Sequence, residues 1–368
     1  MAKARTLAES YRHFADGDAG RSPLYGRVCL ALSESDEALR ALEAVPARAR
    51  HPTLILAALH DLALAGRAPA LSAAYAAGDG AAAARAAIDT LLQLTESVVA
   101  IAVRRRARPE ETGRYPVLLP AIAEAARRGG APTVGLIDVG CSAGFNLQVD
   151  RVGITYHPNL SRSGSPTTPG DSAPAQVMGD PSSSVQLSAV VVGTRPLPTT
   201  AMPEVVARVG VDVDPVDVTD ADDARWLRAC LAPDQPERAL RLEAELALAA
   251  TTPRLLLRGT AVEMMPAAFA QVPADALPVV TSTWALSRLP LESRLRFLHR
   301  LDEAAAGRTV AWVSAEGVGV APTIPTLGDR HASGHSIIGL AVLDQSALHA
   351  EAVGRCWSRG ETLAWLAG

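Results

Sequence analysis

The sequence has little lysine and little cysteine. Lys3 is the only lysine, and the 368 residues include four cysteines. Scarce lysine beside abundant alanine and arginine is typical of a GC-rich coding sequence, so arginine clusters such as residues 104–106 carry little functional weight. The cysteines contain no CxxC pair, which argues against a zinc ribbon or a disulfide scaffold and fits a reducing cytoplasm. They are Cys29, Cys141, Cys230 and Cys356.

Long apolar runs and a charge excess are absent as well. The sequence has no uninterrupted stretch of about 18 strongly apolar residues, and its opening residues, MAKARTLAESYRHF, lack the apolar core of a signal peptide. A formal net charge of -4 and a pI near 6.1 give no general attraction for nucleic acid or an anionic membrane. We therefore expect a cytoplasmic protein with no membrane-spanning segment and no nucleic-acid partner.

Length and periodicity predict two domains. The 368 residues exceed the roughly 250–300 at which a single core stops growing. Residues 1–130 show helical spacing and no convincing strand. Pro52 suits the start of a helix that Gly66 would end, and the apolar run 81–107 is helical in pattern. We expect a helical domain over 1–130 that packs on the next domain as a cap or closes over a substrate.

Residues 131–368 have a different texture. Strand-like runs alternate with helical ones, which predicts a parallel sheet with helices on both faces. A Ser/Pro/Gly-rich insertion at about 153–205 interrupts this alternation, and within it the segments AQVMG and VQLSAVVVG are candidates for a two-stranded ribbon. At the end of the chain, HSIIGLAVLD and ALHAEAVGRCW are expected to form a closing antiparallel pair.

The segment LIDVGCSAGFNL, residues 136–147, is the most informative motif. Its pattern predicts a strand, a tight glycine turn and a helix. In an open α/β sheet such a turn lies at the carboxyl end of a strand, where ligands bind. Gly140 and Gly144 let the backbone turn and approach a ligand without a Cβ in the way.

Two other interpretations of this motif remain open. A dinucleotide fingerprint needs glycines at positions held here by Gly140, Ser142 and Phe145, and phenylalanine prevents the close packing of helix on strand. The G-x-S-x-G elbow of serine hydrolases matches residues 140–144 with Ser142 as nucleophile. That fold places several strands before its elbow, whereas this sequence offers only helices there. Three histidines follow in the order such an enzyme requires: His331, His335 and His349.

A binding site for S-adenosylmethionine explains more of the sequence. That site needs an acidic residue late in the first strand and then glycines at alternate positions. Asp138, Gly140 and Gly144 fit this pattern, and Ser142 replaces the middle glycine. A second acidic residue should end the next strand, where its carboxylate can accept both ribose hydroxyls. VGVDVDP supplies Asp212 for this role, with Asp214 as the alternative. The absence of a phosphate cradle also fits this cofactor.

The chain resembles, over nearly its whole length, the bacterial family known as domain of unknown function 2332. The resemblance implies a methyltransferase-like fold but no particular reaction. Many members carry an aspartate after the third-strand glycine, whereas here Gly259 is followed by Thr260 and Ala261. In class I methyltransferases that aspartate binds the adenine amino group, so Thr260 or a backbone group must take this role. The resemblance is carried by residues 111–123, 136–151, 208–230 and 233–238.

Four further residues are candidates for the acceptor side of the site. Glu316 ends the fifth strand, where an acceptor would meet the cofactor, and a role in capping a neighbouring segment explains this position equally well. His335 is a second candidate for a general base. Its i, i+4 spacing from His331 resembles a metal pair, but Gly334 favours a loop, and we expect no metal. Arg114 and Tyr115 lie between two helices and are expected to help close the active site.

Together these observations predict an α/β fold: a Rossmann-like class I methyltransferase sheet at residues 131–368 with an N-terminal all-helical domain. The predicted function is methyl transfer from S-adenosylmethionine to a small-molecule acceptor held between the helical domain and the sheet edge, in a protein that could be a homodimer. The alternatives are a non-catalytic nucleoside-binding regulator or scaffold and a serine hydrolase. The residues predicted to bind the cofactor are Asp138, Gly140, Cys141, Ser142, Ala143, Gly144, Asn146, Asp212, Asp214, Thr260, Ala261 and Thr281. The predicted catalytic residues are Glu316, His335, Arg114 and Tyr115.

Overall fold

The computed structural model describes residues 6–18, 22–108, 112–159, 175–198, 201–345 and 347–367. Internal contacts divide the chain into two compact units, Met1–Glu111 with Asp217–Leu246 and Thr112–Val216 with Ala247–Gly368. This division differs from a single cut near residue 130. Helix α8 (Tyr115–Arg128) belongs to the second unit, whereas residues 217–246 belong to the first.

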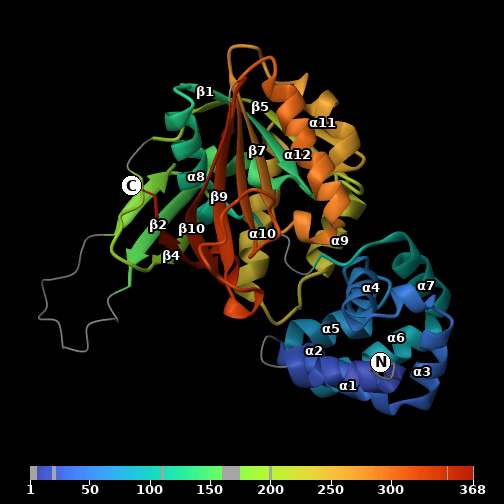
Figure 1. The fold of residues 1–368 in the computed structure, drawn as a ribbon. Coiled ribbons are helices and arrows are strands. Elements are labelled where there is room, and N and C mark those ends of the chain that lie inside the picture. The colour runs from blue at the N-terminus through green and yellow to red at the C-terminus, as the bar shows by residue number, and fades with distance from the viewer. Residues whose placement is uncertain are drawn as a thin grey trace, which may run out of the picture. The chain divides into compact units, whose positions relative to one another are not determined.

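The first unit is helical throughout its described residues. Proline occupies the first turn of three of its helices, at Pro23, Pro52 and Pro69, where the missing N–H leaves no bond unmade. The expected helix from Pro52 to Gly66 is confirmed as α4. The run 81–107 forms two helices with a sharp bend between them, at Leu94, rather than one. The elements, coloured blue to teal in Figure 1 except for the last, are α1 (Leu7–Asp18), α2 (Pro23–Glu34), α3 (Asp36–Glu43), η1 (Ala47–Ala49), α4 (Pro52–Leu64), α5 (Pro69–Ala77), α6 (Gly80–Gln93), α7 (Thr95–Arg104) and α9 (Ala221–Ala229).

The second unit is built on one large mixed sheet. Within the described residues it has eleven strands in the order β3-β2-β4-β11-β10-β9-β8-β7-β1-β5-β6. The strands are β1 (Thr133–Val139), β2 (Gly153–Pro158), β3 (Gln176–Gly179), β4 (Gln186–Val191), β5 (Glu204–Asp212), β6 (Leu255–Arg258), β7 (Leu277–Thr283), β8 (Val310–Gly317), β9 (Ser336–Leu343), β10 (Leu348–Trp357) and β11 (Thr362–Trp365). Its helical elements are α8, η2 (Phe145–Arg151), α11 (Ala261–Phe269), η3 (Leu286–Arg288), α12 (Leu291–Ala305), η4 (His331–Ser333) and η5 (Ser358–Gly360), while α10 (Pro236–Thr251) begins in the first unit.

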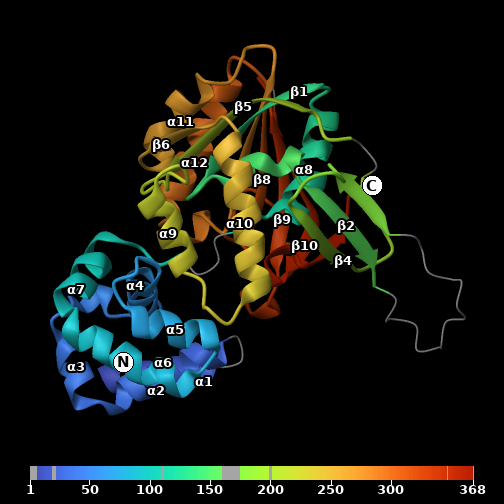
Figure 2. The ribbon, with the colours of Figure 1, turned by 180° about the vertical axis from the view of Figure 1, so that it is seen from behind.

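Five neighbouring strands of this sheet run parallel, in the order β6-β5-β1-β7-β8. From β1 the chain order proceeds outward in both directions, so the sheet has a switch point between β1 and β7. Helix α8 covers one face, and α11 and α12 cover the other (Figures 1 and 2). The core on the α11 and α12 side contains Ile137, Val280, Trp312 and Phe297, none of them exposed.

The other half of the sheet is mostly antiparallel. The expected closing pair is confirmed, since β9 and β10 pair antiparallel and β9 also pairs with β8. The expected ribbon of AQVMG with VQLSAVVVG is wrong: β3 pairs with β2, and β4 runs parallel to β2 and β11. Part of the predicted insertion, residues 160–174, 199 and 200, lies outside the described residues. The described part supplies the strands β2, β3 and β4. These strands pair with one another through β2 and join the main sheet where β4 pairs with β11.

The protein is therefore an α/β protein with a large mixed sheet, in which the predicted parallel arrangement is found in the five strands β6-β5-β1-β7-β8. In the parts of the chain that the structure describes, no single helix is long and apolar enough to cross a membrane. Two sharply bent pairs, α4 with α5 and α6 with α7, reach that length and composition only together.

Candidate functional site

The turn after β1 is tight and left-handed. Gly140, Ser142 and Gly144 all have positive φ, at 73°, 50° and 73°. The N–H groups of Gly140 and Cys141 donate to the carbonyl of Val211 on β5, at 2.8 and 3.3 Å. A Cβ on Gly140 would lie 2.8 Å from the Cβ of Ala285, so only glycine fits there. The turn is thus pinned between the ends of β5 and β7.

Asp212, the last residue of β5, fastens this turn. One carboxylate oxygen accepts a hydrogen bond from the Ser142 N–H at 3.0 Å, and the other accepts from the Asp214 N–H at 2.8 Å. Both donors are neutral, and a carboxylate offers about four acceptor positions. Asp212 therefore orders the turn through two of these acceptor positions.

Asp138, near the end of β1, is fully buried and bonded to the neighbouring strand. The Thr281 hydroxyl donates to it at 2.6 Å, and the Asn146 amide lies 3.2 and 3.3 Å from its two oxygens. The same amide nitrogen lies 3.2 Å from the Thr283 hydroxyl. Asp138, Asn146 and Thr281, all predicted as cofactor ligands, thus form one polar cluster at the switch point. Thr283 belongs to this cluster and was missed, because its alternation with Thr281 also fits an ordinary strand.

The helix expected after the turn is the irregular 3₁₀ segment η2, in which Gln148 has non-helical dihedrals. Gln148 is fully buried, and neither of its amide atoms has a hydrogen-bond partner among the described residues. No sequence signal distinguishes it from a surface glutamine. The segment between the turn and β2, which begins at Gly153, is too short for a long α-helix.

Arg114 and Tyr115 lie beside this cluster. The Arg114 N–H donates to the Asn146 side-chain oxygen at 2.8 Å, and the guanidinium carbon lies 5.5 Å from the ring centre of Trp284. Trp284 has a positive φ of 52°, and its indole N–H donates to Ser336 at 2.8 Å. This strained tryptophan after β7 was missed by the sequence analysis. Tyr115 is fully buried at the start of α8, so its side chain contributes packing.

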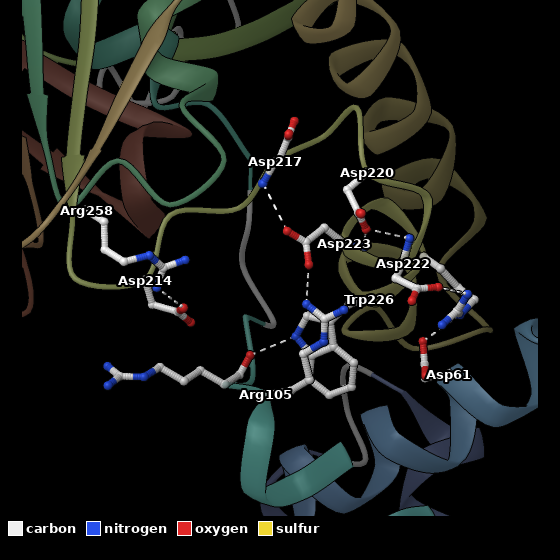
Figure 3. A network of polar contacts seen from close by, with 11 residues as sticks. Asp61, Arg105, Asp214, Asp217, Asp220, Asp222, Asp223, Trp226 and Arg258 are labelled. Carbon is white, nitrogen blue, oxygen red and sulfur yellow. Dashed lines mark hydrogen bonds and ion pairs between the residues drawn. The ribbon is translucent and has the colours of Figure 1, made fainter. Parts of the chain in front are cut away.

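The remaining predicted cofactor residues lie at the ends of β5 and β6. The Thr260 hydroxyl and Glu263 form a reciprocal capping box at the start of α11, where Ala261 is the first helical residue. The Thr260 hydroxyl is therefore engaged in a cap. Asp214 forms an exposed ion pair with Arg258 at 3.0 Å, as Figure 3 shows, and so differs from Asp212 in its environment.

Glu316 is held at the end of β8 and is 1% exposed. One carboxylate oxygen accepts from the N–H groups of Ala285 and Leu286, both at 3.0 Å, at the start of η3. The other oxygen is buried, with no hydrogen-bond partner among the described residues. Burial raises the pKa of Glu316 to about 7, against the effect of the two N–H groups.

His335 lies in a separate polar group near the start of β9. Its Nε2 is 2.9 Å from an Asp329 oxygen, and its Nδ1 is 3.3 Å from the Ser333 carbonyl. Arg355 donates to the same Asp329 carboxylate at 2.7 and 3.2 Å, which lowers the pKa of Asp329. Because both ring nitrogens face acceptors, this geometry favours a hydrogen-bonding role over that of a general base. Among the described residues no group of three or more His, Cys, Asp or Glu side chains is arranged to hold a metal ion.

The segment 217–230, part of the resemblance noted above, serves the helical unit. Asp223 forms an ion pair with Arg105 and accepts from the Asp217 N–H at 3.1 Å (Figure 3). Trp226 is 1% exposed and belongs to the core, and its indole N–H donates to the Arg106 carbonyl at 2.9 Å. Asp61 on α4 binds Arg225 at 2.9 Å. These contacts attach α9 to the N-terminal helices.

Comparison with known families gives one match. Residues 8–365 match the family described as uncharacterized protein conserved in bacteria, domain of unknown function 2332. The match covers nearly the whole chain, so the chain belongs to this family, as its motifs predicted. No curated protein matches the sequence.

Proposed function

Starting from this family membership, we propose that the protein is an S-adenosylmethionine-dependent methyltransferase acting on a small molecule. The observation that carries the proposal is the joining of two strand ends. Asp212, at the end of β5, accepts a hydrogen bond from Ser142 in the glycine turn after β1. A turn and a carboxylate placed together at the carboxyl edge of parallel strands suit a ligand with a ribose.

The strand order supports a Rossmann-like assignment for this half of the sheet. Numbered by their order along the chain, the strands β6-β5-β1-β7-β8 have the 3-2-1-4-5 arrangement of doubly wound folds. The antiparallel β9 beside β8 is compatible with a class I methyltransferase sheet. The connection from β1 to β5 departs from that fold, because it runs through η2 and the three strands β2, β3 and β4.

The residues present fit a nucleoside that carries a positive charge and no phosphate. The bonds that hold Asp212 come from backbone N–H groups, so its negative charge is available to a nearby cation. Its remaining acceptor positions suit ribose hydroxyls. Because the Thr260 hydroxyl caps α11, backbone groups are the better candidates for reading adenine.

The cofactor, when bound, supplies the methyl group, and the protein contributes mainly orientation. The Gly140–Gly144 turn and Asp212 would hold the nucleoside. Arg114, stacked on Trp284, would hold the acceptor beside the Asn146 cluster at about 3–3.5 Å from the transferred carbon. Asn146 would fix the position of Arg114 relative to Asp138, because its side chain is hydrogen-bonded to both residues.

A second candidate is a protein that binds a nucleoside without catalysis. It is favoured by one observation: Glu316 and His335, the predicted general bases, are both engaged in bonds to neighbouring segments. The two proposals share the ligand and differ in turnover. A serine hydrolase is a third and weaker candidate, because β1 is the first strand among the described residues and Ser142 is bonded to Asp212 through its backbone.

Calorimetric titration with S-adenosylmethionine and S-adenosylhomocysteine tests the proposal. We expect micromolar affinity for the wild type and a loss of tenfold or more in Asp212→Ala, since a charge-assisted hydrogen bond contributes about 1.5–3 kcal/mol. Asp212→Asn keeps one acceptor oxygen and should lose less. The matched control is Asp214→Ala, which removes an exposed carboxylate two residues away and should stay within about threefold.

Three outcomes would count against this function. Absence of binding to the wild type would remove both nucleoside proposals. Equal affinities for wild type and Asp212→Ala would remove Asp212 from the site. Stoichiometric labelling of Ser142 by a fluorophosphonate probe would favour the hydrolase instead. Methyl transfer to any acceptor in a small-molecule mixture would separate the enzyme from the non-catalytic binder.

A further inference from the structure

Glu316 lies between the proposed ligand site and the α12 side of the sheet. One of its carboxylate oxygens accepts from the N–H groups of Ala285 and Leu286. Ala285 in turn contacts Gly140, where an added Cβ would come within 2.8 Å of the Ala285 Cβ. A chain of direct contacts therefore joins the buried carboxyl to the first glycine of the turn.

The segment that carries Ala285 is held from two sides. On α12, the Arg294 guanidinium donates to the carbonyls of Leu289 at 2.9 Å and Ser287 at 3.5 Å. Glu316 holds the N–H groups at the other end of the same segment. Trp284, immediately before it, has a positive φ, so its backbone conformation must be imposed by these surroundings.

The environment of Glu316 disfavours its charged form. Its second oxygen is buried without a partner among the described residues. The charged group that acts on it from the packed elements is Arg294, which is bonded to backbone carbonyls instead. Val318 and Val320, in the loop after β8, are buried and apolar, and Ser314, two residues before Glu316 on β8, is buried and neutral.

We propose that Glu316 is a positioning residue: it holds Ala285 against Gly140, and because its ionised form is costly to bury, loss of its proton makes this segment, and the glycine turn with it, open more readily. Describing that turn as a ligand site rests on the function proposed above. The raised pKa of Glu316, about 7, places the change in an accessible range. Linkage fixes the sign: an opening that hydrates the carboxyl restores its ordinary pKa of 4.5, so opening becomes easier as pH rises from 4.5 to about 7.

Hydrogen exchange on the full chain tests this without a ligand. We expect the opening of peptides covering residues 284–289 and 139–145, corrected for intrinsic exchange, to increase at least tenfold between pH 5 and pH 7.5. Glu316→Gln keeps an acceptor for Ala285 and Leu286 but cannot ionise, so its corrected opening should be independent of pH. Glu263→Gln, at the exposed cap of α11, is the matched control and should behave as the wild type.

The wild-type series alone can overturn the proposal, even if Glu316→Gln fails to fold. Corrected opening that does not change with pH in residues 284–289 would show that Glu316 does not hold them. A change confined to residues 284–289, with residues 139–145 unaffected, would disprove the coupling to the turn.

S-adenosylhomocysteine provides a separate arm. If it binds, it should protect both peptides, and binding without protection of residues 284–289 would contradict the coupling. If it does not bind, the proposed function fails while the pH series still decides the role of Glu316.

Discussion

In the helical unit the buried Asp61 and the half-buried Asp223 lie against arginines, whereas in the sheet unit Asp212 accepts from backbone N–H groups and the buried Asp138 accepts from a hydroxyl and an amide. An arginine neutralises the carboxylate and ties two segments together, which is a structural use of charge. The hydrogen bonds to Asp212 come from neutral backbone N–H groups, which leave the negative field of a carboxylate in place. The sheet unit places such groups at one edge, at the ends of β1 and β5.

Under the proposed function, this difference separates residues that stabilise the fold from residues that would bind the ligand. In the helical unit these polar contacts attach α9 to the N-terminal helices. At the sheet edge, the Asp212 carboxylate orders a turn by accepting from the N–H groups of Ser142 and Asp214. Substitutions that change one region and leave the other intact test this comparison.

The largest expected effect is in the helical unit. Trp226→Ala should lower the free energy of unfolding of this unit by about 3–5 kcal/mol, because it leaves a cavity in place of a fully buried ring. Trp226→Phe should cost less, since it loses the indole bond to Arg106 but fills most of the space. Denaturant unfolding followed by circular dichroism measures both. A loss below about 1 kcal/mol for Trp226→Ala would contradict the role assigned to α9.

The next effect is a pH dependence located in the sheet unit. Since the folded-state pKa of Glu316 is raised to about 7 from 4.5, the folded protein binds this proton more tightly than the unfolded chain. This stabilisation is complete below pH 4.5 and is lost as pH rises through about 7, a change of about 3 kcal/mol. Unfolding measured from pH 5 to pH 8 should show this decline in the wild type and a flatter profile in Glu316→Gln. Parallel profiles for the two proteins would show that another group is responsible.

Part of this arrangement could be predicted from the sequence. The strand-turn pattern around Asp138 and the acidic end of β5 are local signals, and parallel strands bring such ends to one edge. The helix between Pro52 and Gly66 was equally predictable, because proline in the first turn and glycine after the last turn mark helix ends.

The rest depends on contacts that no local pattern contains. Strand β4 pairs with β11, about 170 residues further along the chain, and nothing in either segment identifies the other. Trp226 looks the same in sequence whether it packs on the helices or the sheet. The engagement of Glu316 with Ala285 and Leu286 likewise follows from the β7–β8 register, so a general base and a positioning residue could not be told apart beforehand.

The smallest expected effect tests the sheet edge itself. Thr281→Val preserves shape but removes the hydroxyl that donates to the buried Asp138 at 2.6 Å. Removing one partner of a buried hydrogen bond should cost about 2 kcal/mol of stability. Thr283→Val is the matched control two residues along β7. It removes a 3.2 Å contact with Asn146, whose amide stays bonded to Asp138, so its cost should be about 1 kcal/mol or less.

The same pair of variants tests ligand binding. Asp138 accepts a hydrogen bond from the Asn146 amide, and the Asn146 side-chain oxygen accepts one from the Arg114 N–H. Thr281→Val should therefore weaken binding of S-adenosylhomocysteine more than the control does. If both variants lose equal stability and neither changes affinity, the cluster is ordinary sheet packing and the contrast between the two units fails at this position.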